Sequence, residues 1–393
     1  MDKSSENLEQ LMADLRLDLP LALQIQKLER VRPGEKRGTF MLTCSLARTA
    51  SGRFWSSWAG REDGPRGNLY LAYSDDRGET WTPALFTLSG KDTPHHFHLT
   101  NRVGSLWWHN GTLYLFFIQT IGYFDGRAGT WMTRCENPDE SDPDKIRWSE
   151  PVRLWHGTPL NKPCIRKNGE WLLPVSLSKR ENVRLRTTEP VHLSADIFAE
   201  LDAVRGANVL VSTDQGKSWQ WRSFQRCTDP LFDEHHILER RDGSLRIYAR
   251  DTFGIVSCDS FDGAYSWTPF KREFYTTSAR FFVTALPSGN WLMVRYDTEN
   301  PDSRKNITAY LSEDEGKSWI GGLLLDDREK ISYPDGFIAE DGRIFVQYDH
   351  LRQNGSLYMA VFREEDVRAG KNVSGDVILR KKLQIPEDPQ TES

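Results

Sequence analysis

One octapeptide pattern, Ser-x-Asp-x-Gly-x-Ser/Thr-Trp, constrains the fold of this chain more than any other feature. It occurs at residues 74–81, 212–219 and 312–319, and a degenerate fourth copy at 260–267 has Ala264 in place of the glycine. The aspartate side chain can accept hydrogen bonds from backbone N–H groups ahead of it, and glycine adopts the positive φ of a tight turn. The tryptophan is suited to filling the space between neighbouring sheets. A turn that recurs in this way predicts a protein built from structural repeats.

A second repeat sets the number of units. A polar residue, a glycine and an apolar, β-rich run follow one another six times, with the glycines at positions 52, 111, 169, 243, 289 and 342. Each copy has the pattern of a hairpin turn that opens a strand. Successive glycines lie 59, 58, 74, 46 and 53 residues apart, and a four-stranded propeller blade takes about 40–50 residues. The octapeptide turns, which we call Asp-boxes, are interleaved with these glycines. We therefore expect an all-β protein, a six-bladed β-propeller of four-stranded antiparallel blades with Asp-box turns.

The propeller is expected to occupy residues 39–393, after an N-terminal extension at 1–38. Leucines and a methionine between positions 8 and 15 have helical spacing, which predicts a short amphipathic helix before Pro20.

Composition and charge narrow the function classes. The net charge is −5, with acidic and basic residues mixed throughout, so neither nucleic acid nor an anionic membrane is indicated as a partner. No apolar run approaches the roughly 18–20 residues of a membrane helix. The five cysteines have no metal-ligand spacing, and their odd number fits free thiols in a reducing compartment. The first residues do not resemble a signal peptide. We therefore expect a cytoplasmic protein without metal or cofactor, or a secreted or periplasmic one if a leader has been removed, and the oligomeric state stays open.

Propeller loops at one rim form a concave pocket to which several blades contribute. Asp-boxes on six blades resemble the sialidase (neuraminidase) superfamily over roughly residues 40–365. The resemblance implies an exo-acting glycoside hydrolase that grips a sugar carboxylate with three arginines and uses a tyrosine nucleophile, a glutamate base and an aspartate acid/base. Arginine offers a rigid fork that matches a carboxylate. A neutral tyrosine avoids repulsion from an anionic sugar but needs a neighbouring base.

The family pattern maps onto five positions in the second half of the chain. Glu234 precedes a glycine-turn strand that ends at Arg250, so these two are similar to the tyrosine-activating glutamate and the second arginine. Arg304 leads into the strand before the Asp-box at 312, where the family has its third arginine. Tyr333 comes just before the last glycine turn, in the position of the nucleophile. Asp349 stands where sialidases have the glutamate that orients the first arginine.

The first arginine itself is missing. The matching stretch, residues 42–48, has no arginine at the expected position, and Arg37 and Arg48 are displaced neighbours. Asp349 is also one methylene shorter than the family's glutamate. These departures indicate that the substrate is an acidic or unusual sugar other than a standard sialoside.

Further residues are expected in the pocket. Asp63 beside Glu62, or else Asp125, is the candidate acid. Asp125 and Arg127 share a glycine-bracketed loop after a buried strand. The remaining candidates for substrate binding come from the Asn-Lys-Pro, Ser-Tyr-Pro-Asp-Gly and histidine-cluster segments, and they are Lys162, Asp335 and His96.

Three alternatives to the retaining hydrolase stay open. The missing arginine fits a propeller that binds a glycan without cleaving it. An inverting hydrolase would use an aspartate or histidine to activate water, and a lyase would act on a uronic acid. Which sugar and which linkage are recognised does not follow from the sequence.

Overall fold

The computed structural model describes residues 27–386 except 33, 36, 65, 93–97, 122–124, 184–197 and 228–233. The expected N-terminal helix before Pro20 lies outside the described residues.

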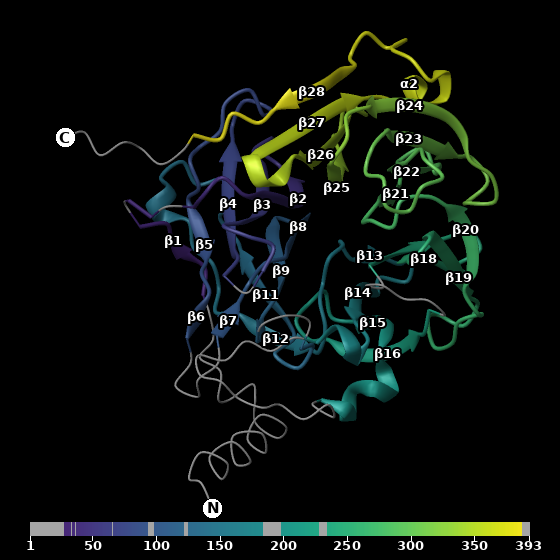
Figure 1. Ribbon diagram of the computed structural model, residues 1–393, viewed down its shortest axis with the longest axis horizontal. Coiled ribbons are helices and arrows are strands. Elements are labelled where there is room, and N and C mark those ends of the chain that lie inside the picture. Colours follow the sequence, from purple (N-terminus) through teal and green to yellow (C-terminus); the bar gives the residue numbers. More distant parts are fainter. Residues whose placement is uncertain are drawn as a thin grey trace, which may run out of the picture.

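Six antiparallel sheets form blades around a central axis, which confirms the six-bladed β-propeller (Figure 1). Within each blade consecutive strands pair in order, and the first strand lies nearest the axis. Blade one contains β2 (Met41–Arg48), β3 (Phe54–Gly60), β4 (Asn68–Ser74) and β5 (Phe86–Leu88). Blade two contains β8 (Gly104–His109), β9 (Thr112–Ile118), β11 (Thr130–Cys135) and β12 (Val152–Trp155). Blade three contains β13 (Cys164–Ile165), β14 (Trp171–Leu177), β15 (Gly206–Ser212) and β16 (Gln220–Gln225).

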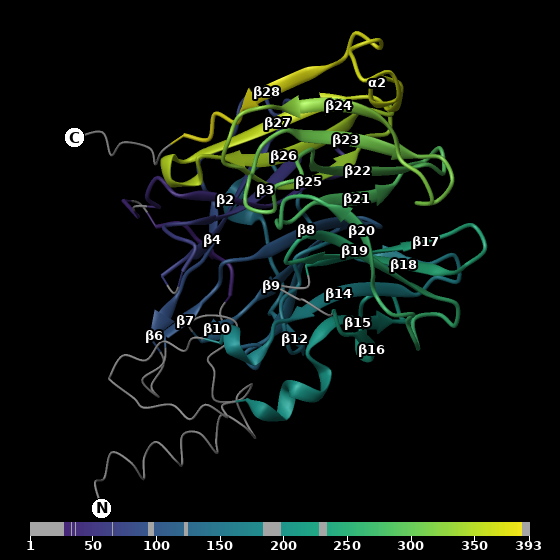
Figure 2. The same ribbon diagram turned by 45° about the vertical axis from the view of Figure 1, so that its right-hand side comes forward.

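The second half of the chain repeats the arrangement. Blade four contains β17 (His235–Glu239), β18 (Leu245–Asp251), β19 (Gly254–Ser260) and β20 (Lys271–Tyr275). Blade five contains β21 (Phe282–Ala285), β22 (Trp291–Tyr296), β23 (Ile307–Ser312) and β24 (Ile320–Asp326). Blade six contains β25 (Ile331–Ile338), β26 (Ile344–His350), β27 (Ser356–Phe362) and β28 (Ile378–Lys382). Figure 2 shows β24 and β28 on the outside of their blades.

A few elements lie outside the repeat. Strand β1 (Glu29–Arg30), within the region expected to be an extension, pairs with β5 and adds a fifth strand to blade one. A small sheet combines β6 (Lys91–Asp92), β7 (His98–Thr100) and β10 (Thr120–Ile121). The described helices are short: η1 (Pro143–Lys145), η2 (Arg180–Asn182), η3 (Ala199–Val204), η4 (Arg352–Asn354) and α2 (Glu364–Ala369). No helix in the described part of the chain has the length and hydropathy to cross a membrane.

The six glycine turns are hairpins between the first and second strands of the blades. All six glycines have φ between 80° and 96°, the left-handed region that glycine enters without steric cost. The prediction of six units from these turns is therefore confirmed by one hairpin in each blade.

The Asp-boxes connect the third and fourth strands of blades one, three, four and five. In the first, the Asp76 carboxylate accepts hydrogen bonds from the Thr80 backbone N–H at 2.8 Å and from the Ser74 hydroxyl at 2.7 Å. The degenerate box keeps the same bonds, with the Ser266 N–H 2.9 Å from Asp262 Oδ1. Ala264 adopts a φ of 71° at the glycine position. The side-chain hydrogen bonds of the box thus hold the turn even where glycine is absent.

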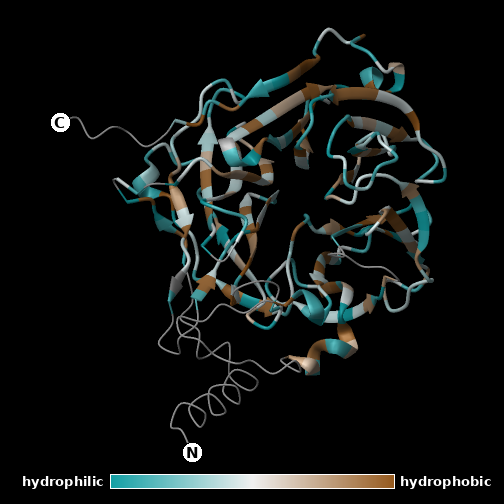
Figure 3. Ribbon diagram, viewed as in Figure 1, coloured by the Kyte–Doolittle hydropathy of each residue, from teal (hydrophilic) through white to brown (hydrophobic). Residues whose placement is uncertain are grey.

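Apolar side chains fill the spaces between blades, and Figure 3 shows hydrophobic segments within the strands and hydrophilic ones in many connecting loops. Box tryptophans take part, since the Trp219 ring lies 5.8 Å from Phe116 of the preceding blade. Blades six and one close the ring, with Phe54 packed edge-on against Phe337 and Phe345 at 4.9 Å between ring centroids.

The antiparallel order of strands gives the propeller two distinct faces. Every glycine turn and Asp-box lies at one end of the blades, which we call the turn face. The starts of first strands, the ends of second strands and the starts of third strands lie at the other end, the loop face. Residues at those chain positions therefore meet around the axis although they are far apart in sequence.

Candidate active site

Five of the residues singled out in the second half of the chain fall on elements that reach the loop face. Glu234 directly precedes β17, and Arg250 is near the end of β18. Arg304 lies in the connection before β23, Tyr333 near the start of β25, and Asp349 near the end of β26.

A tyrosine–glutamate–arginine cluster lies at the centre of this group. The Tyr333 hydroxyl is 3.2 Å from Glu234 Oε1, and Arg250 Nη1 donates to the same oxygen at 3.2 Å. The exposed fractions of Glu234 and Arg250 are 4% and 3%. Glu234 Oε2 is buried without a hydrogen-bond partner among the described residues. The carboxylate is thus held through one of its oxygens by both the arginine and the tyrosine.

The backbone at Tyr333 is unusual. Its φ is 54°, a region that costs a bulky side chain energy and that folded proteins retain mostly where function or packing requires it. The pairing of β25 with β26 shifts register between Ser332 and Asp335, so Tyr333 lies in a bulge, which re-aims side chains. The Tyr296 hydroxyl accepts the Tyr333 N–H at 3.3 Å.

Burial, and then the Glu234 carboxylate, raises the pKa of Tyr333, while Arg250, Arg304 and Arg352 act in the opposite direction. The phenol is therefore protonated at neutral pH and needs a base to become a nucleophile. Glu234 is the carboxylate in hydrogen-bond contact with it.

Two further guanidinium groups lie beside the tyrosine. Those of Arg304 and Arg352 are 5.7 Å and 4.9 Å from the centroid of the Tyr333 ring. Arg304 donates to the Ser332 hydroxyl at 2.8 Å and forms no ion pair with a described residue. Its charge is thus available to an anion.

Arg352 is the residue that the sequence reasoning missed. Its Nε lies 3.3 Å from Asp349 Oδ1, and Asp349 is fully buried and also accepts the Thr43 N–H at 3.2 Å. Asp349 thus orients an arginine, but that arginine is three residues further along the chain in η4. Burial raises the pKa of Asp349 to about 6, against the opposing effects of Arg352 and the Thr43 N–H.

The two displaced neighbours of the missing first arginine have other contacts. Arg37 donates to the backbone carbonyls of Ile385 and Pro386 at 3.2 Å and 2.7 Å. Arg48 lies at the turn face, 3.4 Å from Glu340.

The signal that could have identified Arg352 in the sequence is its spacing of three residues from Asp349, the carboxylate that orients it.

The candidate acids lie in different surroundings. Asp63 is 44% exposed and lies between Arg352 and Arg102, at 3.6 Å and 3.8 Å. Asp125 is completely buried and accepts hydrogen bonds from the Thr120 hydroxyl and from backbone N–H groups of its own loop. Burial raises the pKa of Asp125. Its carboxylate stabilises the loop, whereas Asp63 belongs to the arginine cluster.

The remaining predicted residues lie apart from Tyr333. Arg127 is half-buried and lies 3.7 Å from Glu200. Lys162 and Asp335 form an ion pair with each other in a cavity that opens at the turn face. His96 lies outside the described residues. Among the described residues no group of three histidine, cysteine or acidic side chains is arranged to hold a metal ion.

Comparisons with known proteins agree with this architecture. Residues 52–346 match the model of a family described as a BNR repeat-like domain. Comparison with curated proteins gave no match. Solved structures with the same fold include a protein of unknown function from Dyadobacter fermentans, with 15% identity over 85% of this chain and 98% of that chain and a TM-score of 0.57.

Two sialidase structures are also similar. The NanB sialidase from Streptococcus pneumoniae has 13% identity over 88% of this chain and 72% of that chain, with a TM-score of 0.59. The intramolecular trans-sialidase from Ruminococcus gnavus has 14% identity over 87% and 98%, with a TM-score of 0.58. Likenesses at this identity show the fold alone.

Proposed function

Because the chain belongs to the BNR repeat-like family and has a sialidase-like propeller, we propose that it is an exo-acting glycoside hydrolase that removes a terminal acidic sugar from a glycan. The observation that carries this proposal is the contact between the Tyr333 hydroxyl and Glu234 beside Arg250. A partly buried tyrosine in contact with a carboxylate, on a bulge with positive φ, is the arrangement that a tyrosine nucleophile needs.

The charge of the site supports an anionic substrate. The cluster has one positive charge in excess, because it contains four arginines and three carboxylates. These are Arg102, Arg250, Arg304 and Arg352, with Asp63, Glu234 and Asp349. Arg304, without an ion-pair partner, supplies that excess. Guanidinium groups bind carboxylates through paired hydrogen bonds, and Arg250, Arg304 and Arg352, which come from blades four, five and six, all lie near Tyr333.

In the first step the Tyr333 oxygen attacks the anomeric carbon while its proton passes to Glu234. The bond from that carbon to the leaving oxygen breaks, and protonated Asp63 gives its proton to this oxygen. In the second step Asp63 takes a proton from water, whose oxygen bonds to the anomeric carbon. The bond to Tyr333 then breaks and Glu234 returns the proton. Two displacements at one carbon leave its configuration unchanged.

Asp63 must change partners for this role. In the free protein it faces Arg352 and Arg102. A substrate carboxylate that binds Arg352 competes with Asp63 for that guanidinium. Substrate binding would thus release Asp63 from Arg352 and link the carboxylate of the substrate to the acid that the reaction requires.

The test is a proton-NMR time course with 3′-sialyllactose and a set of terminal uronosides. We expect release of one acidic sugar, with the first anomer retaining the configuration of the substrate. Tyr333→Phe should lower the rate at least about 1,000-fold, whereas Tyr275→Phe, a control at an exposed tyrosine of blade four, should not.

Other outcomes would overturn specific parts of the proposal. Full activity of Tyr333→Phe excludes the tyrosine nucleophile. An inverted first anomer indicates attack by water, and an unsaturated product that absorbs in the near ultraviolet indicates a lyase. Saturable binding without turnover at any pH indicates a glycan-binding propeller.

A further inference from the structure

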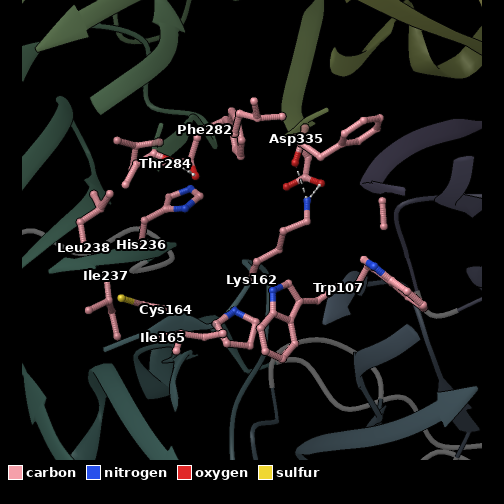
Figure 4. Close-up of a pocket in the computed structure, with 18 of the residues that line it drawn as sticks. Trp107, Lys162, Cys164, Ile165, His236, Ile237, Leu238, Phe282, Thr284 and Asp335 are labelled. Atoms are coloured by element: carbon pink, nitrogen blue, oxygen red, sulfur yellow. Dashed lines mark hydrogen bonds and ion pairs between the residues drawn. The ribbon is translucent and has the colours of Figure 1, made fainter. Parts of the chain in front are cut away.

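A cavity of about 670 Å³ lies at the turn face, where the first strands of all six blades contribute to its wall. Figure 4 shows this cavity, with Lys162 pointing across it toward Asp335. It is the size of pockets that hold small ligands, which typically have about 300–1,000 Å³. It is separate from the tyrosine cluster, because β25 contributes Tyr333 near its start and Asp335 to Ile338 further along.

The walls of the cavity are largely apolar and aromatic. Trp107 and Trp108 come from blade two, Phe282 from blade five and Phe337 from blade six. Trp108 is half-buried, and aromatic faces of this kind cover rings and apolar parts of ligands at low entropic cost. Such walls favour a ligand with a compact ring or apolar body.

Several polar groups of the cavity wall converge on the Asp335 carboxylate. The Lys162 ammonium forms an ion pair with Asp335 and also donates to the Gly336 carbonyl at 2.9 Å. Asp335 Oδ2 further accepts the Ser45 hydroxyl at 2.8 Å and the Leu46 N–H at 2.9 Å. This carboxylate therefore has backbone and hydroxyl donors of its own in addition to Lys162.

A second cation, Arg280, also contacts the Asp335 carboxylate. Arg280 is buried, with its Nη2 3.4 Å from Asp335 Oδ1, and its other donors meet neutral oxygens of Asn161, Leu160 and Cys44. Lys162 and Arg280 thus face one carboxylate, which leaves one positive charge in excess. A buried excess charge is costly unless an opposite charge or hydrogen-bond partners compensate it.

Lys162 is the group that can meet a ligand. An ammonium has three N–H donors, and the described residues accept two of them, through Asp335 and Gly336. Nearby His236 has its Nε2 3.0 Å from the Phe281 carbonyl, which assigns the hydrogen to Nε2 and leaves Nδ1 as an acceptor. Burial lowers the pKa of His236 to about 3, so this ring adds no charge at neutral pH.

We propose that this cavity is a second ligand site, which binds a small organic carboxylate with a ring-shaped body. The carboxylate accepts the third N–H of Lys162, and the ring lies against Trp108 and Phe282. A hydroxyl of the ligand can donate to His236 Nδ1. Sugar acids and aromatic acids share this chemistry. The site is independent of the hydrolysis proposed above, since it uses none of the groups around Tyr333.

Isothermal titration calorimetry with N-acetylneuraminate, glucuronate and phenylacetate tests the proposal. The titrations use Arg304→Ala protein, so that carboxylate binding at the loop face is weakened. We expect saturable binding of at least one probe, and the probe that binds distinguishes a sugar acid from an aromatic acid. Lys162→Met in this background should weaken that binding about 10- to 100-fold.

Lys167→Met is the matched control, because Lys167 also lines the cavity but donates to the backbone carbonyl of Arg241 at 2.7 Å. If Lys162→Met lowers the melting temperature strongly, Trp108→Ala replaces it and should also weaken binding at least about 10-fold. Equal affinities of the Lys162→Met and Lys167→Met proteins, or no binding of any probe, would overturn the proposal. A protein that binds a probe here but does not cleave any glycan would contradict the hydrolase proposal and leave this one intact.

Discussion

Replacing Asp349 with asparagine should remove a loss of stability that the parent protein undergoes as the pH rises. Asp349 is fully buried, and burial raises its pKa from 3.8 to about 6. For a carboxyl with a raised pKa in the folded state, stability is fully present below the unfolded pKa and is lost as the pH rises through the folded pKa. Asparagine keeps the shape of the side chain but does not ionise, so the variant does not undergo this loss.

The size of the effect follows from the two pKa values. Linkage gives a loss of about 1 kcal/mol in the free energy of unfolding at about pH 4.5 and of about 3 kcal/mol at about pH 7.5, for pKa values of 3.8 unfolded and about 6 folded. The stability of Asp349→Asn relative to the parent should therefore rise by about 2 kcal/mol between these pH values.

Urea unfolding followed by tryptophan fluorescence at both pH values measures this difference. Asp326→Asn is a control whose relative stability should stay nearly constant between the two pH values, because Asp326 is equally buried but its contacts with Arg328 lower its pKa below 3.8. The stability that Asp326 contributes is present above its unfolded pKa and is lost as the pH falls. A relative stability of Asp349→Asn that stays constant within about 0.5 kcal/mol, or that falls as the pH rises, would refute the assignment of Asp349 as a buried carboxylate with a raised pKa.

Three further changes test the site and the repeat. Glu234→Gln should lower kcat about 100- to 10,000-fold with little change in KM, because it removes the proposed base for the Tyr333 proton; a normal kcat in initial-rate assays would contradict that role. Arg352→Lys should raise KM about 10-fold, since an ammonium cannot form the paired hydrogen bonds of a guanidinium, and an unchanged KM would argue that Arg352 does not contact the substrate. Gly316→Ala should cost about 2–4 kcal/mol in urea unfolding, since a Cβ there would lie 2.2 Å from the Tyr248 hydroxyl at a φ of 85°; a loss below about 1 kcal/mol would show that this turn relaxes easily.

The blade count could be predicted because the repeating turns are local. An Asp-box is held by hydrogen bonds between side chains and backbone within a few residues, as between Asp76 and Thr80. A glycine with positive φ, such as Gly111, likewise reflects a requirement of its own hairpin. Such features appear in the sequence wherever the turn occurs. Strand β1, in contrast, forms only through its pairing with β5 more than fifty residues later, and no pattern in its two residues indicates this partner.

The tyrosine cluster was also accessible from the sequence, since its members occupy equivalent chain positions in successive blades. The antiparallel order of strands brings the start of β17, the end of β18 and the start of β25 to one face. Chain order alone thus places Glu234, Arg250 and Tyr333 near each other. The sequence did not indicate that β25 contributes to both faces of the propeller. A bulge between Ser332 and Asp335 directs Tyr333 and Asp335 to different faces, although they are only two residues apart. Tyr333 lies at the loop face, whereas Asp335 lines the cavity at the turn face.

In the proposed site Arg352 takes the place of the first arginine, and this shows what sequence position does not determine. A site of this kind requires a guanidinium at a given place beside the tyrosine ring, and any strand end that reaches this place can supply it. Blade six lies next to blade one because the ring closes there, and the Thr43 N–H on β2 contacts Asp349 on β26. The arginine expected from blade one could therefore be replaced by Arg352, which follows its orienting carboxylate in η4. An aspartate, shorter than a glutamate, suffices for this pairing, since the guanidinium approaches along the same chain segment instead of from the neighbouring blade. The two departures from the family pattern are thus coupled, and Asp349→Glu should impair substrate binding instead of restoring the family's geometry, which the KM of that variant measures.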